Sequence, residues 1–209
     1  SVYNTAVGYN SGNAVTTGVE NTIIGALAGD AITTGNNNTA MGHNSLSTNI
    51  LSDHNVAIGN DALATHNTAT SIDAYNVAVG SGAGNAVTTG TLNTLIGGNA
   101  GDAFNTGQEN TGIGYQALTT DTKGKFSVAV GNNALATQNF TTATSVFNTA
   151  VGYDAGLHVT TGIQNTLVGA LAGDALTDAD NNVAIGKSAM TANQLGSDSV
   201  AVGTFALNS

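Results

Sequence analysis

A five-residue motif, of which N-T-A-V-G is the type, returns twelve times in this chain. Successive copies begin 17, 17, 17 and then 21 residues apart, and this series recurs every 72 residues. The copies begin at Asn4, Asn21, Asn38, Asn55, Asn76, Asn93, Asn110, Ser127, Asn148, Asn165, Asn182 and Ser199. A short fixed period is typical of a solenoid, in which each repeat packs only against its neighbours, rather than of a compact enzyme. The repeat predicts one elongated domain over residues 1–209, with super-repeats 1–72, 73–144 and 145–209.

The residue types within the motif predict a strand. We label its positions a to e. Position b is only Thr or Val, position d is always Val, Ile or Met, and position e is always Gly. Position c is Ala, Ile or Leu except at Gly112. β-Branched residues favour strands, in which b and d share one face and a, c and e share the other. An invariant glycine indicates positive φ or a close backbone approach.

Both faces of this strand are therefore largely apolar, which is the pattern of a strand covered on both sides. A thin solenoid buries one face in its own core. We expect other copies of the chain to cover the other face, with three chains packed on the face that carries position c.

Core volume is supplied from two alternating chain positions. We call each repeat a rung and each super-repeat a block. The fourth residue after the motif glycine is Gly in the first two rungs of each block and Leu or Met in the last two. Where it is Gly, a bulky residue follows three places later, at Val15, Ile32, Val87, Phe104, Val159 and Leu176. We interpret this as one volume filled from either position, which keeps packing density constant. Asn or Ser at position a predicts a ladder of side chains about 4.8 Å apart, and hence a body of about twelve rungs.

Composition excludes several classes of function. The net charge is −10, with three Lys and Arg residues together, so nothing here would neutralise a nucleic-acid backbone. Apolar runs are only a few residues long, which predicts no transmembrane helix and no membrane insertion. The chain has no cysteine and hence no disulfide. Because the repeat pattern runs to both ends, we expect this chain to be a segment of a longer fibre.

Three segments carry a family resemblance: N-T-A-V-G-Y-N-S-G (residues 4–12), N-V-A-I-G-N-D-A-L (55–63) and S-V-A-V-G-N-N-A-L (127–135). They resemble the head repeats of trimeric autotransporter adhesins and similar repeat regions of phage tail fibres. The resemblance implies an all-β fold, a left-handed parallel β-roll, with three identical chains side by side outside a cell or on a virion.

The rungs are longer than those typical of adhesin heads, and the T-T-G-x-x-N-T rhythm is more similar to tail fibres of phages that infect aquatic bacteria. This favours a structural, adhesive and non-catalytic tail-fibre segment involved in host attachment. The alternative is the head of a bacterial surface adhesin, or an extracellular filament subunit. An ice-binding solenoid is a weaker alternative, because T-T-G is absent from the third and fourth rungs of each block.

The chain offers no pattern that predicts catalysis or metal binding. There is no G-x-S-x-G motif and no recurring carboxylate pair. Asp30, Asp102 and Asp174 do recur at the 72-residue offset, and we expect them to bond nearby backbone N–H groups in turns. The histidines do not recur, and we expect all four on the surface: His43, His54, His66 and His158. We expect no enzyme, no cofactor and no metal.

The 21-residue intervals are the strongest candidates for a binding role. Each adds four residues after the fourth rung of a block, in segments 65–75 and 137–147. Insertions in repeat proteins form loops on one face, often the binding face. Residues in these loops that we expect to contact a receptor, a host-surface glycan or protein, are His66, Asn67, Asp73, Tyr75, Asn139, Phe140 and Phe147. The alternative is a bulge that only sets the geometry of the super-repeat.

Overall fold

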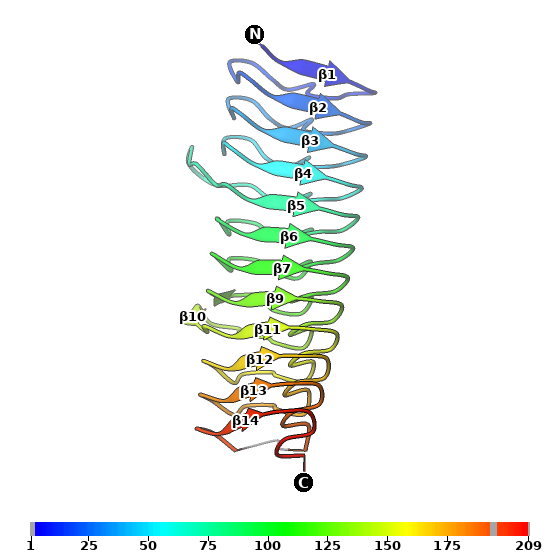
Figure 1. Ribbon diagram of the computed structural model, residues 1–209. Coiled ribbons are helices and arrows are strands. Elements are labelled where there is room, and N and C mark those ends of the chain that lie inside the picture. The colour runs from blue at the N-terminus through cyan, green and yellow to red at the C-terminus, as the bar shows by residue number, and fades with distance from the viewer. Residues whose placement is uncertain (1–2, 193–195, 209) are drawn as a thin grey trace.

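The computed structural model describes residues 3–192 and 196–208, and these form a parallel β-solenoid without a helix (Figure 1). Its main sheet has twelve strands hydrogen-bonded in chain order, so eleven turns of the solenoid separate the first strand from the last. The strands are β1 (Thr5–Val7), β2 (Thr22–Ile24), β3 (Thr39–Met41), β4 (Val56–Ile58), β5 (Val77–Val79), β6 (Thr94–Ile96), β7 (Thr111–Ile113), β9 (Val128–Val130), β11 (Thr149–Val151), β12 (Thr166–Val168), β13 (Val183–Ile185) and β14 (Val200–Val202). A small second sheet pairs β8 (Gly124–Lys125) with β10 (Thr144–Ser145).

The predicted register is confirmed. Each strand spans positions b to d, and every pairing joins b to b, c to c and d to d, as in Val77↔Thr94, Ala78↔Leu95 and Val79↔Ile96. The 21-residue intervals keep this register, because β4 pairs with β5 and β9 with β11 in the same way. In Figure 1 the strands run left to right in front while the chain descends and returns behind them, which is a left-handed winding.

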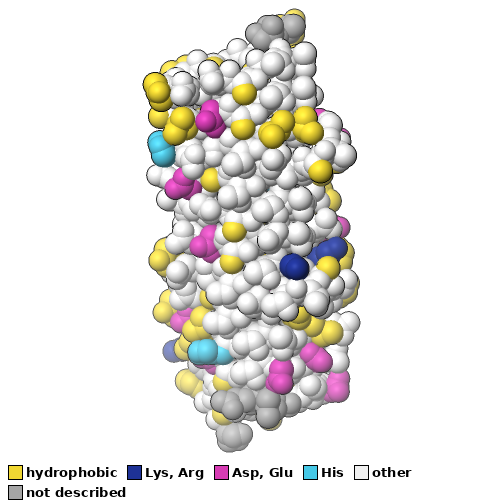
Figure 2. Space-filling model, turned by 180° about the vertical axis from the view of Figure 1, so that it is seen from behind, with side chains coloured by type: hydrophobic (Ala, Val, Ile, Leu, Met, Phe, Trp, Pro, Cys, Tyr) yellow, Lys and Arg dark blue, Asp and Glu magenta, His cyan; other side chains and the backbone are white. Residues whose placement is uncertain are grey.

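The two faces of the main sheet differ in burial, and the expectation that other copies pack on the face with position c is wrong, because that face lies on the core side. Position c points into the core, where Ile23, Ala78 and Leu95 have almost no exposed surface. Positions b and d point outward, and the d side chains Met41 and Ile96 are 36% and 37% exposed. We call the outward side chains at positions b and d of the twelve strands the strand face. It carries only Thr, Val, Ile and Met. On the opposite side, hydrophobic, acidic, lysine and histidine side chains are scattered over a surface made mostly of other side chains and backbone (Figure 2).

The alternating supply of core volume is also confirmed. Phe104 fills the core of its rung, and a Cβ added at Gly101 would lie 2.7 Å from its ring. In the next rung Leu118 is fully buried instead. The interior position that Phe104 occupies is polar in the third and fourth rungs of the first two blocks, where the buried residues are Asn49, His66, Asp121 and Gln138. The sequence pattern had revealed only the apolar half of this alternation.

The motif glycine is required by both causes that an invariant glycine suggests. Gly97 has φ of +136°, and a Cβ there would lie 2.3 Å from the carbonyl oxygen of Gly114 in the next rung. No side chain fits where two backbones come this close.

The predicted asparagine ladder joins the rungs along position a. Asn93 Oδ1 accepts hydrogen bonds from the backbone N–H (3.1 Å) and the Nδ2 (3.2 Å) of Asn110. Its own Nδ2 donates to the carbonyl of Gly107 (2.9 Å) and to Asn76 Oδ1 (3.2 Å). Because Asn93 has no exposed surface, these bonds replace water for buried backbone groups.

Candidate functional site

The two long intervals leave the solenoid at the side where the main strands begin. We call residues 65–75, between β4 and β5, the first long step, and residues 137–147, between β9 and β11, the second long step. Figure 1 shows the first projecting from the body, whereas the second includes β10. The chain thus presents two related loops on one side, four rungs apart.

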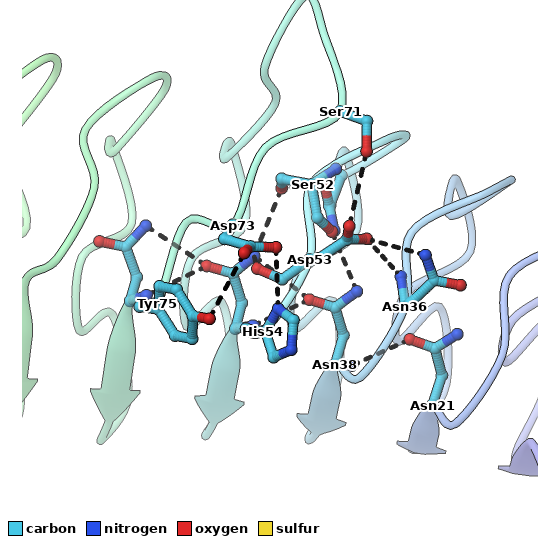
Figure 3. A network of polar contacts seen from close by, with 12 residues as sticks. Asn21, Asn36, Asn38, Ser52, Asp53, His54, Ser71, Asp73 and Tyr75 are labelled. Atoms are coloured by element: carbon cyan, nitrogen blue, oxygen red, sulfur yellow. Dashed lines mark hydrogen bonds and ion pairs between the residues drawn. The ribbon is translucent and has the colours of Figure 1, made fainter.

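A polar network ties the first long step to the rung before it (Figure 3). Asp73 Oδ1 lies 3.1 Å from His54 Nδ1, and the Tyr75 hydroxyl donates to Asp73 Oδ2 at 3.4 Å. Asp53 accepts a hydrogen bond from the backbone N–H of Asn36 at 2.6 Å, and Ser71 Oγ donates to its other oxygen at 3.5 Å. Both carboxylates are thereby held at the surface, where the Asp73 side chain is 56% exposed.

Aromatic rings stack where each long step rejoins the sheet. The rings of His54 and Tyr75 lie 4.8 Å apart at an interplanar angle of 27°. Those of Phe126 and Phe147 lie 5.1 Å apart at 7°. All four residues immediately precede position a. The residue at this place has positive φ in every rung, so the backbone turns its side chain outward. Tyr75 and Phe147 are 48% and 52% exposed.

The polar network of the second long step lies in the interior, whereas that of the first lies on the surface. Gln138 Nε2 donates to Asp121 Oδ2 (2.6 Å) and to Ser127 Oγ (3.1 Å), and its Oε1 accepts from Asn148 Nδ2 (2.9 Å). Asp121 also accepts from the backbone N–H of Phe140 (3.1 Å). Burial raises the pKa of Asp121, and these hydrogen bonds partly offset the rise. Gln138 therefore supplies an amide where Ser127 interrupts the asparagine ladder.

Burial corrects the expectations for two of the predicted contact residues. His66 is fully buried and Phe140 is 7% exposed, so neither is placed to meet a receptor. The expectation that all four histidines lie on the surface is wrong for His66. Its side chain fills the interior position that an apolar residue takes in the first two rungs, so the residue is part of the core rather than of the loop surface.

The other predicted residues lie at or near the surface. Asp73, Tyr75, Asn139 and Phe147 are exposed, and Asn67 is half-buried. Their contact with a receptor stays a prediction. The structure brings Asp73 and Tyr75 together and leaves Asn139 apart from Phe147, with its Oδ1 accepting from Thr122 at 3.3 Å.

Three residues of the polar network and the ring stacks were not predicted from the sequence: Asp53, His54 and Phe126. The signal was present at the 72-residue offset, which aligns His54 with Phe126 and Tyr75 with Phe147. Two ring-bearing residues before position a in adjacent rungs predict a stack, because rungs are about 4.8 Å apart.

The expectation that the recurring aspartates bond to nearby backbone N–H groups holds for Asp174 and not for Asp102. The carboxylate of Asp102 accepts from the hydroxyl of Thr119 in the next rung at 2.5 Å. The carboxyl of Asp174 accepts from the backbone N–H of Ala175, although its Oδ1 is buried without a hydrogen-bond partner. Desolvation raises the pKa of this carboxyl, and the backbone hydrogen bonds partly offset the rise. Within residues 3–192 and 196–208, no three His, Cys, Asp or Glu side chains are grouped to hold a metal ion. The same residues form no pocket and no helix long and apolar enough to cross a membrane.

The threonines of the T-T-G segments bond to the solenoid itself. Thr16 Oγ1 donates to the carbonyl of Thr33, and Thr88 Oγ1 to that of Asn105, in each case one rung on. Ile50 and Asn67 interrupt this column in the third and fourth rungs. The unbroken threonine array of an ice-binding surface is therefore not formed.

No family model matches this chain, and neither a curated protein nor a solved structure matches it. The strand face and the two long steps are therefore the features from which a function can be inferred.

Proposed function

We propose that this chain is a structural and adhesive segment of an extracellular fibre, of the phage tail-fibre kind, which acts in host attachment as a homotrimer and is not an enzyme. The observation that supports the proposal is the strand face. It is continuous over twelve strands, it carries no charged residue, and its d side chains are a third or more exposed at Met41, Ile96 and Val151. An exposed apolar surface of this extent is typical of an interaction site.

The size of the strand face suits association between copies. Eleven steps of about 4.8 Å give a length of about 53 Å, and three residues at about 3.3 Å give a width of about 10 Å. One copy thus contributes roughly 500 Å², and two contacting surfaces bury roughly 1,000 Å², which is near the lower limit for a specific interface. In a ring of three, every copy takes part in two contacts, so the assembly gains more than a single pair does.

The two long steps support the adhesive half of the proposal. Three parallel copies would present six such loops, with exposed rings at Tyr75 and Phe147 and exposed carboxylate at Asp73. Weak individual contacts to a host-surface glycan or protein add up when several act together. The head of a bacterial surface adhesin has the same physical requirements and is the alternative owner of this architecture.

The mass of the chain in solution, measured by light scattering, tests the homotrimer. We expect three times the chain mass of 20.5 kDa, and a monodisperse monomer would contradict the proposal. Ile96→Glu places a charge on the strand face and should lower the mass to that of the monomer. Thr89→Glu is the matched control, because it adds the same charge at an exposed residue outside the strand face and should leave the trimer intact.

Attachment is tested separately on the intact trimer. We expect the trimer to bind host-surface saccharides or envelope proteins, and Tyr75→Ala to weaken that binding without changing the mass. Equal binding by the wild type and a double Tyr75→Ala, Phe147→Ala variant would remove the long steps from the adhesive surface.

A further inference from the structure

The two long steps differ in how their interior polar residues are satisfied. Residues 72 positions apart correspond, so His66 occupies the place of Gln138, and Asn49 that of Asp121. In the second step, Gln138 and Asp121 bond to each other, and Asp121 also holds the backbone of Phe140. That step is therefore tied to the interior of the preceding rung.

In the first long step this connection is missing. Neither ring nitrogen of His66 has a hydrogen-bond partner, although the side chain is fully buried. Asn49 is turned to its own turn instead, where it accepts from the backbone N–H of Ser52 (3.1 Å) and donates to the Ser52 carbonyl (3.0 Å). The neighbouring Asn67 Oδ1 is also buried without a partner.

A neutral imidazole tolerates this environment better than a charged one. Protonation would add a second N–H donor and a positive charge to a place that offers the backbone of Thr88 but no carboxylate. Burial lowers the pKa of His66 from 6.5 to about 4, the backbone of Thr88 partly offsets this, and no charged side chain is among the causes. The groups that face the ring from adjacent rungs, Asn49 and Val87, do not titrate.

We propose that the first long step is an acid-sensitive element of the fold, in which protonation of His66 drives its ring out of the interior and opens residues 65–75. The second long step, with Gln138 at the corresponding place, stays closed. This inference goes beyond the proposed fibre function and does not depend on it.

The attachment of the first step is consistent with local opening. Its tip, residues 69–71, is exposed. The step is held to the preceding rung by Asp53, whose backbone N–H donates to the Ile72 carbonyl at 2.9 Å, and by Thr48 Oγ1, which donates to the His66 carbonyl at 3.3 Å. The other titratable groups around the ring lie on the outer surface: Asp73 and Tyr75 in this step, and Asp53 and His54 in the preceding rung. His54 Nδ1 lies 3.1 Å from Asp73 Oδ1, so this contact holds the step closed rather than opening it.

Hydrogen–deuterium exchange measured between pH 7 and pH 4.5 tests the proposal, with protection corrected for intrinsic exchange. A closed-state pKa of about 4 and an open-state pKa of 6.5 predict that the open population of residues 65–75 rises roughly 50-fold over this range. Residues 137–147 should change little. Equal loss of protection in both steps, or none in the first, would overturn the proposal.

Two variants separate His66 from other acid effects. His66→Gln reproduces the side chain of the second step and should abolish the acid-induced exposure of residues 65–75. Asn49→Asp supplies the missing carboxylate, which should pair with protonated His66 and also keep the step closed in acid. If both variants lose protection in acid as the wild type does, then His66 is not the sensor. Observation of His66 by NMR gives an independent reading, because the pKa of its ring should lie well below the ordinary histidine value of 6.5.

Discussion

Removing one side chain from the centre of the asparagine ladder should destabilise the whole solenoid measurably. In Asn93→Ala, the backbone N–H of Asn110 and the carbonyl of Gly107 both lose their partners at position a. Both lie where Asn93 excludes water, since that residue has no exposed surface. An unsatisfied buried polar group costs about 1–3 kcal/mol, so two such groups predict a loss of roughly 2–6 kcal/mol in the free energy of unfolding.

Urea unfolding followed by circular dichroism measures this loss. All variants must be compared at the same protomer concentration, because association adds to apparent stability. Asn132→Ala is the matched control: Asn132 is exposed, and its removal should change the free energy by less than about 0.5 kcal/mol. A loss below about 1 kcal/mol for Asn93→Ala would refute the reasoning, since it would mean that the ladder bonds do no more than water does.

Four further substitutions test the packing of the rung. Gly97→Ala should cost more than about 3 kcal/mol, because its Cβ would lie 2.3 Å from the Gly114 oxygen at a φ of +136°, and thermal unfolding should show the loss. Gly98→Ala is the control, because its Cβ would lie 3.3 Å from the Tyr115 side chain, and it should leave the stability nearly unchanged. Equal losses of stability in the two variants would contradict the clash at Gly97. Phe104→Ala should lower the free energy of unfolding by about 3–5 kcal/mol, because it leaves a cavity in the core. Adding Gly101→Leu should recover part of that loss, and a purely additive double variant in a mutant cycle would rule out the shared core volume.

The sequence was sufficient to predict the strand, its register and the volume exchange, because each depends on residue type at a fixed place in the rung. Gly at position e and Ala at position c show this directly. The burial of His66 was not predictable from its own rung, because a histidine follows neither the apolar nor the turn pattern. Aligning it with Gln138, Asn49 and Asp121 at corresponding places would have indicated an interior polar layer. Hydrogen-bond partners within that layer depend on side-chain rotamers, which the repeat pattern does not specify.

The candidate site was predicted in position but not in composition. The four extra residues in each 21-residue interval were enough to predict where both long steps lie. The stacks that flank them use His54 and Phe126, which belong to the preceding rung and lie outside the inserted segments. Contacts between rungs join residues about 17–21 positions apart, so a search within the loop alone does not find them.

Electron cryomicroscopy of the assembled chain tests the central claim most directly, because it locates the strand face in the assembly. The account predicts three parallel solenoids side by side, with Ile96 and the other side chains of the strand face buried between copies. A structure in which these side chains face solvent, whether in a single solenoid or in an assembly joined through another surface, would contradict it.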